Sequence, residues 1–76
     1  IELGEAHSIF EVTIPKEWLG MSIGQIDIRK KYNINIIAVK DKGQTNLSVT
    51  PDTLLTADKT MLVLGEDKAL QKCFHI

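Results

Sequence analysis

The stretch IGQIDIRKKYNINIIA, from Ile23 to Ala38, decides the fold of this chain. Its first part has apolar residues near helical spacing beside a charged face, and Ser22 stands directly before it as a good N-cap. After Asn33, the residues from Ile34 to Val39 are rich in β-branched side chains, which favour a strand. The stretch therefore predicts a short helix from about Ser22 to Lys31 that leads directly into a buried strand.

The change from helix to strand brings two polar side chains near each other. Arg29 lies near the C-terminus of the predicted helix, and Asn35 lies at the entry of the strand. A cation at this place also suits the negative end of the helix dipole. We therefore expect Arg29 and Asn35 to converge on one spot.

Apolar periodicity and turn signals predict the other elements of the chain. The predicted elements, in chain order, are a strand over residues 10–14, a helix over 22–31, strands over 35–40, 45–50 and 60–65, and a helix over 66–72. This order, β-α-β-β-β-α, predicts an α+β fold with one mostly antiparallel β-sheet and two helices packed on it.

Two connections can be predicted in more detail. The turn sequence Asp41-Lys42-Gly43 predicts a β-hairpin, because glycine tolerates positive φ. In the strand that follows, Leu47 and Val49 are expected to point inward. Before the first helix, Trp18 and Leu19 are expected to cover one edge of the core.

Composition predicts one small domain with an aliphatic core. The chain has 76 residues, of which 43% are hydrophobic, but only two Phe, one Tyr and one Trp. A domain of this size buries only about 60% of the surface of its unfolded chain, so pairing with a second copy is a reasonable source of stability. Cys73 has no internal disulfide partner, which suits a reducing cytosol.

Charge and hydropathy argue against two kinds of partner. The formal net charge of −1 lacks the basic excess of nucleic-acid-binding proteins, so we expect no nucleic-acid partner. No apolar run approaches the roughly 18 residues of a membrane-spanning helix, so we expect no membrane insertion and no signal peptide. Because the chain begins with Ile1, we interpret it as a piece of a longer protein.

The sequence contains no recognisable catalytic or metal motif. His7 and His75 lie at the two ends of the chain, where neither has a serine and an acid in a catalytic arrangement. Cys73 and His75 supply two ligands, whereas a stable zinc site needs three or four. Asp52 and Asp58 are best interpreted as turn residues. We therefore expect no enzyme activity and no metal site.

Several segments together resemble the C-lobe of the domains that regulate potassium conductance, known as RCK_C or TrkA-C domains. These segments are FEVTIP at residues 10–15, WLGMSI at 18–23, INIIAV at 34–39, and the pairs Pro51-Asp52 and Asp58-Lys59. Within this family, the cytosolic regulatory subunits of Ktr-type potassium uptake systems in Gram-positive bacteria are the most similar. The resemblance implies a single RCK_C domain over residues 1–76, with 1–8 as a lead-in from a missing N-lobe.

The family resemblance also implies a ligand and partners. C-lobes of these subunits pair as homodimers and bind cyclic di-AMP at the dimer interface. The chain would then be cytoplasmic and peripheral to the membrane, through a membrane potassium transporter subunit. No cofactor, and no ATP, ADP or NAD site, is implied in this piece. The implied cyclic di-AMP-binding residues are Ile23, Ile26, Asp27, Arg29, Asn35, Ile36, Ile37, Ala38 and Pro51.

The chemistry of these residue types agrees with such a ligand. A symmetric dimer presents Arg29 twice across its axis, and its planar guanidinium can make two charge-assisted bonds to a phosphate. Aliphatic side chains and Pro51 can enclose adenine, while Asp27 and Asn35 can bind its polar edge. Ala38 would allow close approach of the backbone.

Each of these residues also has a simpler interpretation. Ile36 is expected in the core whatever the function, Asp27 and Lys31 are at the spacing of a surface ion pair, and Arg29 alone would be a solvated charge. The main hypothesis is a domain that senses cyclic di-AMP and thereby inhibits potassium uptake. The alternatives are a purely structural dimerisation lobe without a ligand, and a transporter or antiporter regulator that senses another small anion.

Overall fold

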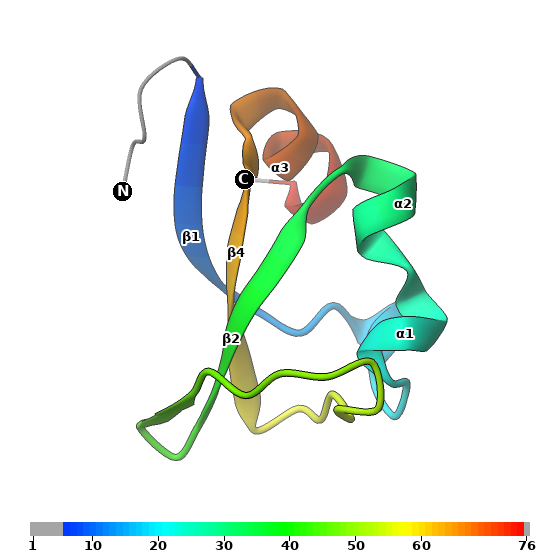
Figure 1. Ribbon diagram of the computed structural model, residues 1–76, viewed down its shortest axis with the longest axis vertical. Helices are drawn as coiled ribbons and strands as arrows, with labels where there is room; N and C mark the ends of the chain where they lie inside the picture. Colours follow the sequence, from blue (N-terminus) through cyan, green and yellow to red (C-terminus); the bar gives the residue numbers. More distant parts are fainter. Residues whose placement is uncertain (1–5, 76) are drawn as a thin grey trace.

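The computed structural model describes residues 6–75 as a four-stranded antiparallel sheet with helices on one face (Figure 1). The strand order in the sheet is β1-β4-β2-β3. The elements are β1 (His7–Thr13), the 3-10 helix η1 (Lys16–Trp18), α1 (Ile23–Ile26), α2 (Ile28–Tyr32), β2 (Asn35–Asp41), β3 (Gln44–Asn46), β4 (Lys59–Glu66) and α3 (Asp67–Phe74). The predicted α+β class with an antiparallel sheet is confirmed.

The core lies between the sheet and the helices. On the central strand β4, Met61 and Val63 are fully buried and face the helices, whereas Leu62 and Leu64 alternate onto the other face and are half-buried. The core is aliphatic, as the composition predicts. Its fully buried larger side chains are Ile34, Leu55, Met61, Val63 and Leu70.

A β-bulge explains the irregular apolar pattern of β2. Ile36 pairs with Val63 and Ala38 pairs with Leu62, so Ile37 is an extra residue on the β2 side of this ladder. Because of this extra residue, the alternation shifts by one, and Ile36 and Val39 both pair with residues of the core face. Ile37 and Ala38 are then both opposite Leu62, on the other face.

The first helical region differs from the prediction of one continuous helix over 22–31. Asp27 has φ of 55° and ψ of 38°, a left-handed conformation that ends α1 and begins α2. Aspartate is one of the few non-glycine residues that adopt this conformation readily. On one continuous helix, the side chains of Ile26 and Ile28 would point to nearly opposite sides, because they are two positions apart. The break at Asp27 lets both be buried.

The hairpin after β2 has the predicted turn but a shorter second strand. Lys42 and Gly43 both have positive φ, which is typical of a two-residue hairpin loop. The expected strand over 45–50 is wrong beyond Asn46, because the Asn46 side chain accepts a hydrogen bond from the Ser48 backbone N–H at 2.9 Å and turns the chain. Leu47 is 75% exposed rather than inward, while Val49 is half-buried against the core.

At the other end of the molecule, β1 and α3 are joined by specific contacts. His7 and Ser8 belong to β1, so the lead-in predicted over residues 1–8 is wrong for these two; residues 1–5 lie outside the described residues. The Ser8 hydroxyl donates to Asp67 Oδ1 at 2.6 Å. The rings of Trp18 and Phe74 pack edge to face, with centroids 5.6 Å apart.

Candidate functional site

A cavity of about 260 Å³ lies where α1, α2 and the start of β2 meet the loop after β3. Because α2 leads into β2 almost directly, Arg29 and Asn35 both line this cavity. Its lining residues are Ile23, Gly24, Asp27, Ile28, Arg29, Ile34, Asn35, Ile36, Val49, Thr50 and Pro51.

The wall formed by α1 is held in place by backbone hydrogen bonds. Ser22 and Gln25 form a capping box, in which the Gln25 side chain accepts from the Ser22 N–H at 2.8 Å. The Gly24 N–H donates to the Pro51 carbonyl at 2.8 Å. A Cβ atom at Gly24 would lie 3.1 Å from both the Cβ and the carbonyl oxygen of Pro51. A side chain at position 24 would therefore crowd Pro51, and α1 or Pro51 would have to move by a few tenths of an ångström.

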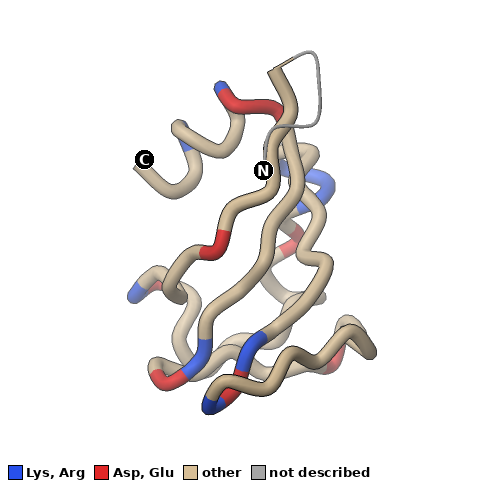
Figure 2. Tube along the Cα trace, turned by 90° about the vertical axis from the view of Figure 1, so that its left-hand side faces the viewer, with Lys and Arg blue, Asp and Glu red and all other residues tan. Residues whose placement is uncertain are grey.

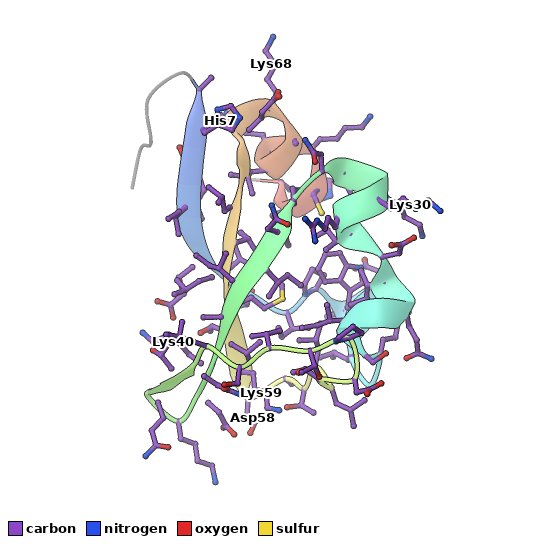
Figure 3. The ribbon with its side chains drawn as sticks, viewed as in Figure 1. His7, Lys30, Lys40, Asp58, Lys59 and Lys68 are labelled. Carbon is purple, nitrogen blue, oxygen red and sulfur yellow. The ribbon has the colours of Figure 1, made fainter. Side chains whose placement is uncertain are left out.

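The charged groups of the site are exposed and unpaired. Within residues 6–75, neither the Asp27 carboxylate nor the Arg29 guanidinium has a hydrogen-bond or ion-pair partner. The surface pair of Asp27 with Lys31 is not formed, because Asp27 is in the left-handed conformation between two helices. Lys30 extends away from the sheet side of α2 (Figure 3). Arg29 is thus the cation that lines the cavity and can meet an anion there.

The other residues that line the cavity are mostly apolar, and their burial increases from the rim to the base. Ile28 and Ile34 are buried and form the base, whereas Ile23, Ile36 and Val49 are half-buried. Exposed residues, among them Thr50 and Pro51, stand at the rim. Such a cavity can take a flat apolar ring while leaving charged groups of the same molecule near Arg29.

Six of the nine residues predicted to bind the ligand line the cavity, and three do not. The six are Ile23, Asp27, Arg29, Asn35, Ile36 and Pro51. Ile26 and Ala38 have exposed fractions of 5% and 0%, so both are enclosed by protein atoms. Ile37 is half-buried and belongs to the bulge opposite Leu62.

Sequence reasoning missed five residues that line the cavity: Gly24, Ile28, Ile34, Val49 and Thr50. Gly24 carried a usable signal, because a glycine early in a helix often marks a close approach of two backbones. Val49 was expected to point inward from a strand, and it reaches this cavity from a loop instead.

A second hollow, of about 450 Å³, lies between β1, η1 and the end of α3, and includes Glu11, Cys73 and His75. Partial burial raises the pKa of the Cys73 thiol, which disfavours the nucleophilic thiolate. The part of the chain that the structure describes contains no cluster of three or more His, Cys, Asp or Glu that could hold a metal. Its helices are all too short or too polar to cross a membrane.

Within residues 6–75, an arginine without a side-chain partner stands at an apolar cavity, which is the arrangement of a ligand-binding domain. The chain belongs to the TrkA-C domain family, whose model matches residues 8–75. This match agrees with the resemblance seen in the sequence.

Individual relatives give the same picture. Ktr system potassium uptake protein C of Bacillus subtilis (strain 168) is 31% identical over 65 residues, which are 86% of this chain and 29% of that protein. The chain therefore spans less than a third of that relative. The RCK C domain of the potassium transport protein KtrA, solved in complex with cyclic di-AMP, is 33% identical. Its TM-score is 0.84, over 91% of this chain and 81% of that one.

A more distant solved structure shares the fold. It is the RCK_C domain dimer of S. agalactiae BusR in complex with cyclic di-AMP, with 20% identity and a TM-score of 0.71. The match covers 93% of this chain and 97% of that one. At this identity the likeness concerns the fold alone, which extends over nearly the full length of both domains.

Proposed function

We propose that this chain is the ligand-sensing C-lobe of a potassium transport regulator, and that it binds cyclic di-AMP at a homodimer interface. The observation that supports this most is the unpaired Arg29 at an apolar cavity, in a chain similar to a KtrA domain solved with cyclic di-AMP. The alternative explanation of Arg29, a solvated helix charge, does not account for its place in the cavity lining.

Arg29 is the residue that binds the phosphates in this proposal. Cyclic di-AMP is two-fold symmetric and carries two phosphates, so a symmetric homodimer offers one guanidinium to each. The planar fork of arginine can donate two parallel hydrogen bonds to one phosphate, which a lysine ammonium cannot do with the same geometry. Lys30 and Lys31, on the exposed side of α2, contribute only diffuse attraction.

The adenine base occupies the apolar part of the cavity. Ile23, Ile36 and Pro51 contact its faces, and their exposure leaves apolar surface for a ring to cover. The Asp27 carboxylate accepts from the adenine amino group, and the Asn35 amide can both donate and accept. Ile37 contacts the ligand from the bulge, and the enclosed Ile26 and Ala38 support the site rather than touch the base.

In the full-length protein, the ligand acts by favouring one arrangement of the two C-lobes. A ligand shifts such an equilibrium only by its difference in affinity for the two arrangements. The attached assembly then lowers potassium uptake through a membrane transporter subunit. The inhibitory direction and a cytoplasmic position peripheral to the membrane are part of this proposal; the similarity to a Ktr potassium uptake protein supports the link to potassium uptake.

Calorimetry with cyclic di-AMP tests the site. We expect Arg29→Ala to weaken binding by about 10-fold or more while the circular dichroism spectrum is unchanged, because a charge-assisted pair contributes about 1.5–3 kcal/mol. Lys30→Ala is the matched control, since it removes a neighbouring cation that points away from the cavity. Equal affinity of wild type and folded Arg29→Ala would refute the assignment.

The rival function is a structural dimerisation lobe without a ligand of its own. A thermal shift panel of cyclic and linear nucleotides separates the two, because a ligand that binds only the folded state raises the melting temperature. We expect a rise with cyclic di-AMP and little change with linear AMP. A flat response across the panel favours the rival, and a response to other small anions favours a different sensor at the same cavity.

A further inference from the structure

The turn at the rim of the cavity is closed by its own side chains. Thr50-Pro51-Asp52-Thr53 is a β-turn in which the Thr53 N–H donates to the Thr50 carbonyl at 3.1 Å, and its second position is one that proline favours. The Thr53 hydroxyl also accepts from the Thr50 N–H at 3.1 Å. The Thr50 hydroxyl accepts from the Asp52 N–H at 3.3 Å. Two threonine side chains therefore fix the turn that carries Pro51.

Few other interactions order this turn. It lies in the connection between β3 and β4, which runs past α1 (Figure 1). Thr50 and Pro51 are exposed, so burial contributes little to their position. Charge contributes little as well, because Asp52 is the one charged residue within 47–57 (Figure 2) and forms no ion pair with the described part of the chain. The position of the rim therefore depends on the hydroxyl of Thr53.

The same turn supports α1, which forms the neighbouring wall of the cavity. The four residues of α1 are too few to make a stable helix alone. Its first N–H groups have no acceptor within the helix. The Ile23 N–H donates to the Thr53 carbonyl at 3.0 Å, and the Gly24 N–H donates to the Pro51 carbonyl at 2.8 Å. Because Ile23 and Pro51 both line the cavity, a shift of the turn would displace two of its apolar walls together.

We infer that Thr53 is a positioning residue for the ligand, although it does not line the cavity. This inference rests on the proposed function. The Thr53 hydroxyl holds the Thr50 N–H, the closed turn places Pro51, and Pro51 presents the apolar surface assigned to adenine. An apparent dissociation constant rises as the fraction of molecules in the binding shape falls. Thr53 thus raises the affinity without touching the ligand.

Thr53→Val tests the inference, because valine keeps the branched shape and loses the hydroxyl. We expect calorimetry with cyclic di-AMP to show binding weakened about 3- to 10-fold, which is the equivalent of one neutral hydrogen bond. Thr53→Ser keeps the hydroxyl and should bind like the wild type. Thr56→Val is the matched control, because the Thr56 hydroxyl donates to Asp58, which does not line the cavity. We expect its affinity to be unchanged.

Amide hydrogen exchange without nucleotide gives a readout that does not depend on the ligand. Gly24 is exposed, so protection of its N–H depends on the bond to the Pro51 carbonyl. In Thr53→Val we expect this N–H to exchange at least about 3-fold faster. The Asp67 N–H, which donates to the Ala6 carbonyl between β4 and α3, should exchange as in the wild type. Equally faster exchange at both sites would indicate general destabilisation and would overturn the inference.

A double-mutant cycle shows whether Thr53 acts through Pro51. Pro51→Ala removes the ring that the turn positions, so adding Thr53→Val should weaken binding by less than about 2-fold more. Additive effects, wild-type affinity of Thr53→Val, or unchanged exchange at Gly24 would each overturn the inference. If Thr53→Val loses its native circular dichroism spectrum, Thr53→Ala replaces it. If the wild type does not bind cyclic di-AMP at all, the proposed function fails, and exchange at Gly24 alone decides whether Thr53 positions the rim.

Discussion

The polar side chains are paired at one junction between a helix and a strand of this domain and unpaired at another. At the junction of β4 and α3, the Asp67 carboxylate accepts from the Ser8 hydroxyl at 2.6 Å, and the Asp67 N–H donates to the Ala6 carbonyl at 2.7 Å. At the junction of α2 and β2, Asp27 and Arg29 have no side-chain partner within residues 6–75. Both junctions pack on the same core.

This difference in pairing indicates that one junction contributes to stability and the other is available to a ligand. Paired polar groups and a fully buried Leu70 fix α3 against the sheet, so that junction contributes stability. Unpaired exposed charges beside an apolar cavity contribute little to stability, and they remain available to a ligand. We therefore expect substitutions at the α3 junction to lower the free energy of unfolding, and substitutions at the α2 junction to lower ligand affinity.

The largest effect is expected at Leu70, on the α3 side. Leu70→Ala should lower the free energy of unfolding by about 2–5 kcal/mol, because Leu70 is fully buried and the substitution leaves a cavity. That loss is comparable with the whole stability of many small domains, which is about 5–15 kcal/mol. Urea denaturation followed by circular dichroism measures it. Under conditions where the variant is folded, its affinity for cyclic di-AMP should stay close to that of the wild type. A folded variant with lowered affinity would contradict the assignment of stability to the α3 junction and ligand binding to the α2 junction.

The next largest effect is expected at Gly24, in the wall of the cavity beside the α2 junction. Gly24→Val should weaken cyclic di-AMP binding by about 10-fold, because a Cβ at this position would lie 3.1 Å from the Pro51 carbonyl oxygen and push the cavity wall outward. Overpacking of this kind costs about 1–3 kcal/mol. Gln71→Val is the control, because it places the same side chain at an exposed position of α3, away from the cavity. Calorimetry that finds equal affinities for the two variants would show that Gly24 does not shape the site.

A smaller effect compares the two junctions directly. Ser8→Ala should lower the free energy of unfolding by about 1–2 kcal/mol, because it removes a buried hydroxyl that donates to Asp67. Arg29→Ala should change it by less than about 0.5 kcal/mol, since the side chain is exposed and unpaired. Chemical denaturation of both variants measures the contrast. Equal losses would mean that Arg29 has a structural role.

Much of the fold could be predicted because local signals agree with the final packing. The strand β4 and the turn at Lys42-Gly43 follow from apolar runs and from the preference of glycine for positive φ. The break at Asp27 could not be predicted, because its left-handed conformation is justified only by the burial of Ile26 and Ile28 on both sides of it. That burial depends on the sheet and not on the local sequence.

The site was predictable in its polar part and less so in its apolar part. Arg29 and Asn35 lie in one short stretch, so their convergence follows from local geometry. Val49 reaches the cavity through a loop created by the Asn46 side chain, and Ile37 leaves the alternation of β2 through a bulge. The bulge depends on pairing with the distant β4, whereas the Asn46 turn is local but sends Val49 to a cavity whose other walls come from α1, α2 and β2. Apolar periodicity encodes neither.

The smallest expected effect concerns the paired Glu11 on β1. Hydrogen bonds from Thr60 and from Lys40 lower the pKa of the Glu11 carboxyl. A carboxyl whose pKa is lower in the folded state stabilises the fold above its unfolded pKa, about 4.3, and that contribution is lost as the pH falls through the folded pKa. Wild type should therefore melt slightly above Glu11→Gln at pH 6. The difference should shrink as the pH falls from about 4.3 through the lower pKa of the folded state, where the carboxyl becomes protonated. Thermal melts of both proteins over this pH range measure the difference. A constant gap between wild type and Glu11→Gln at every pH would mean that the substitution acts through packing, not through the charge of Glu11.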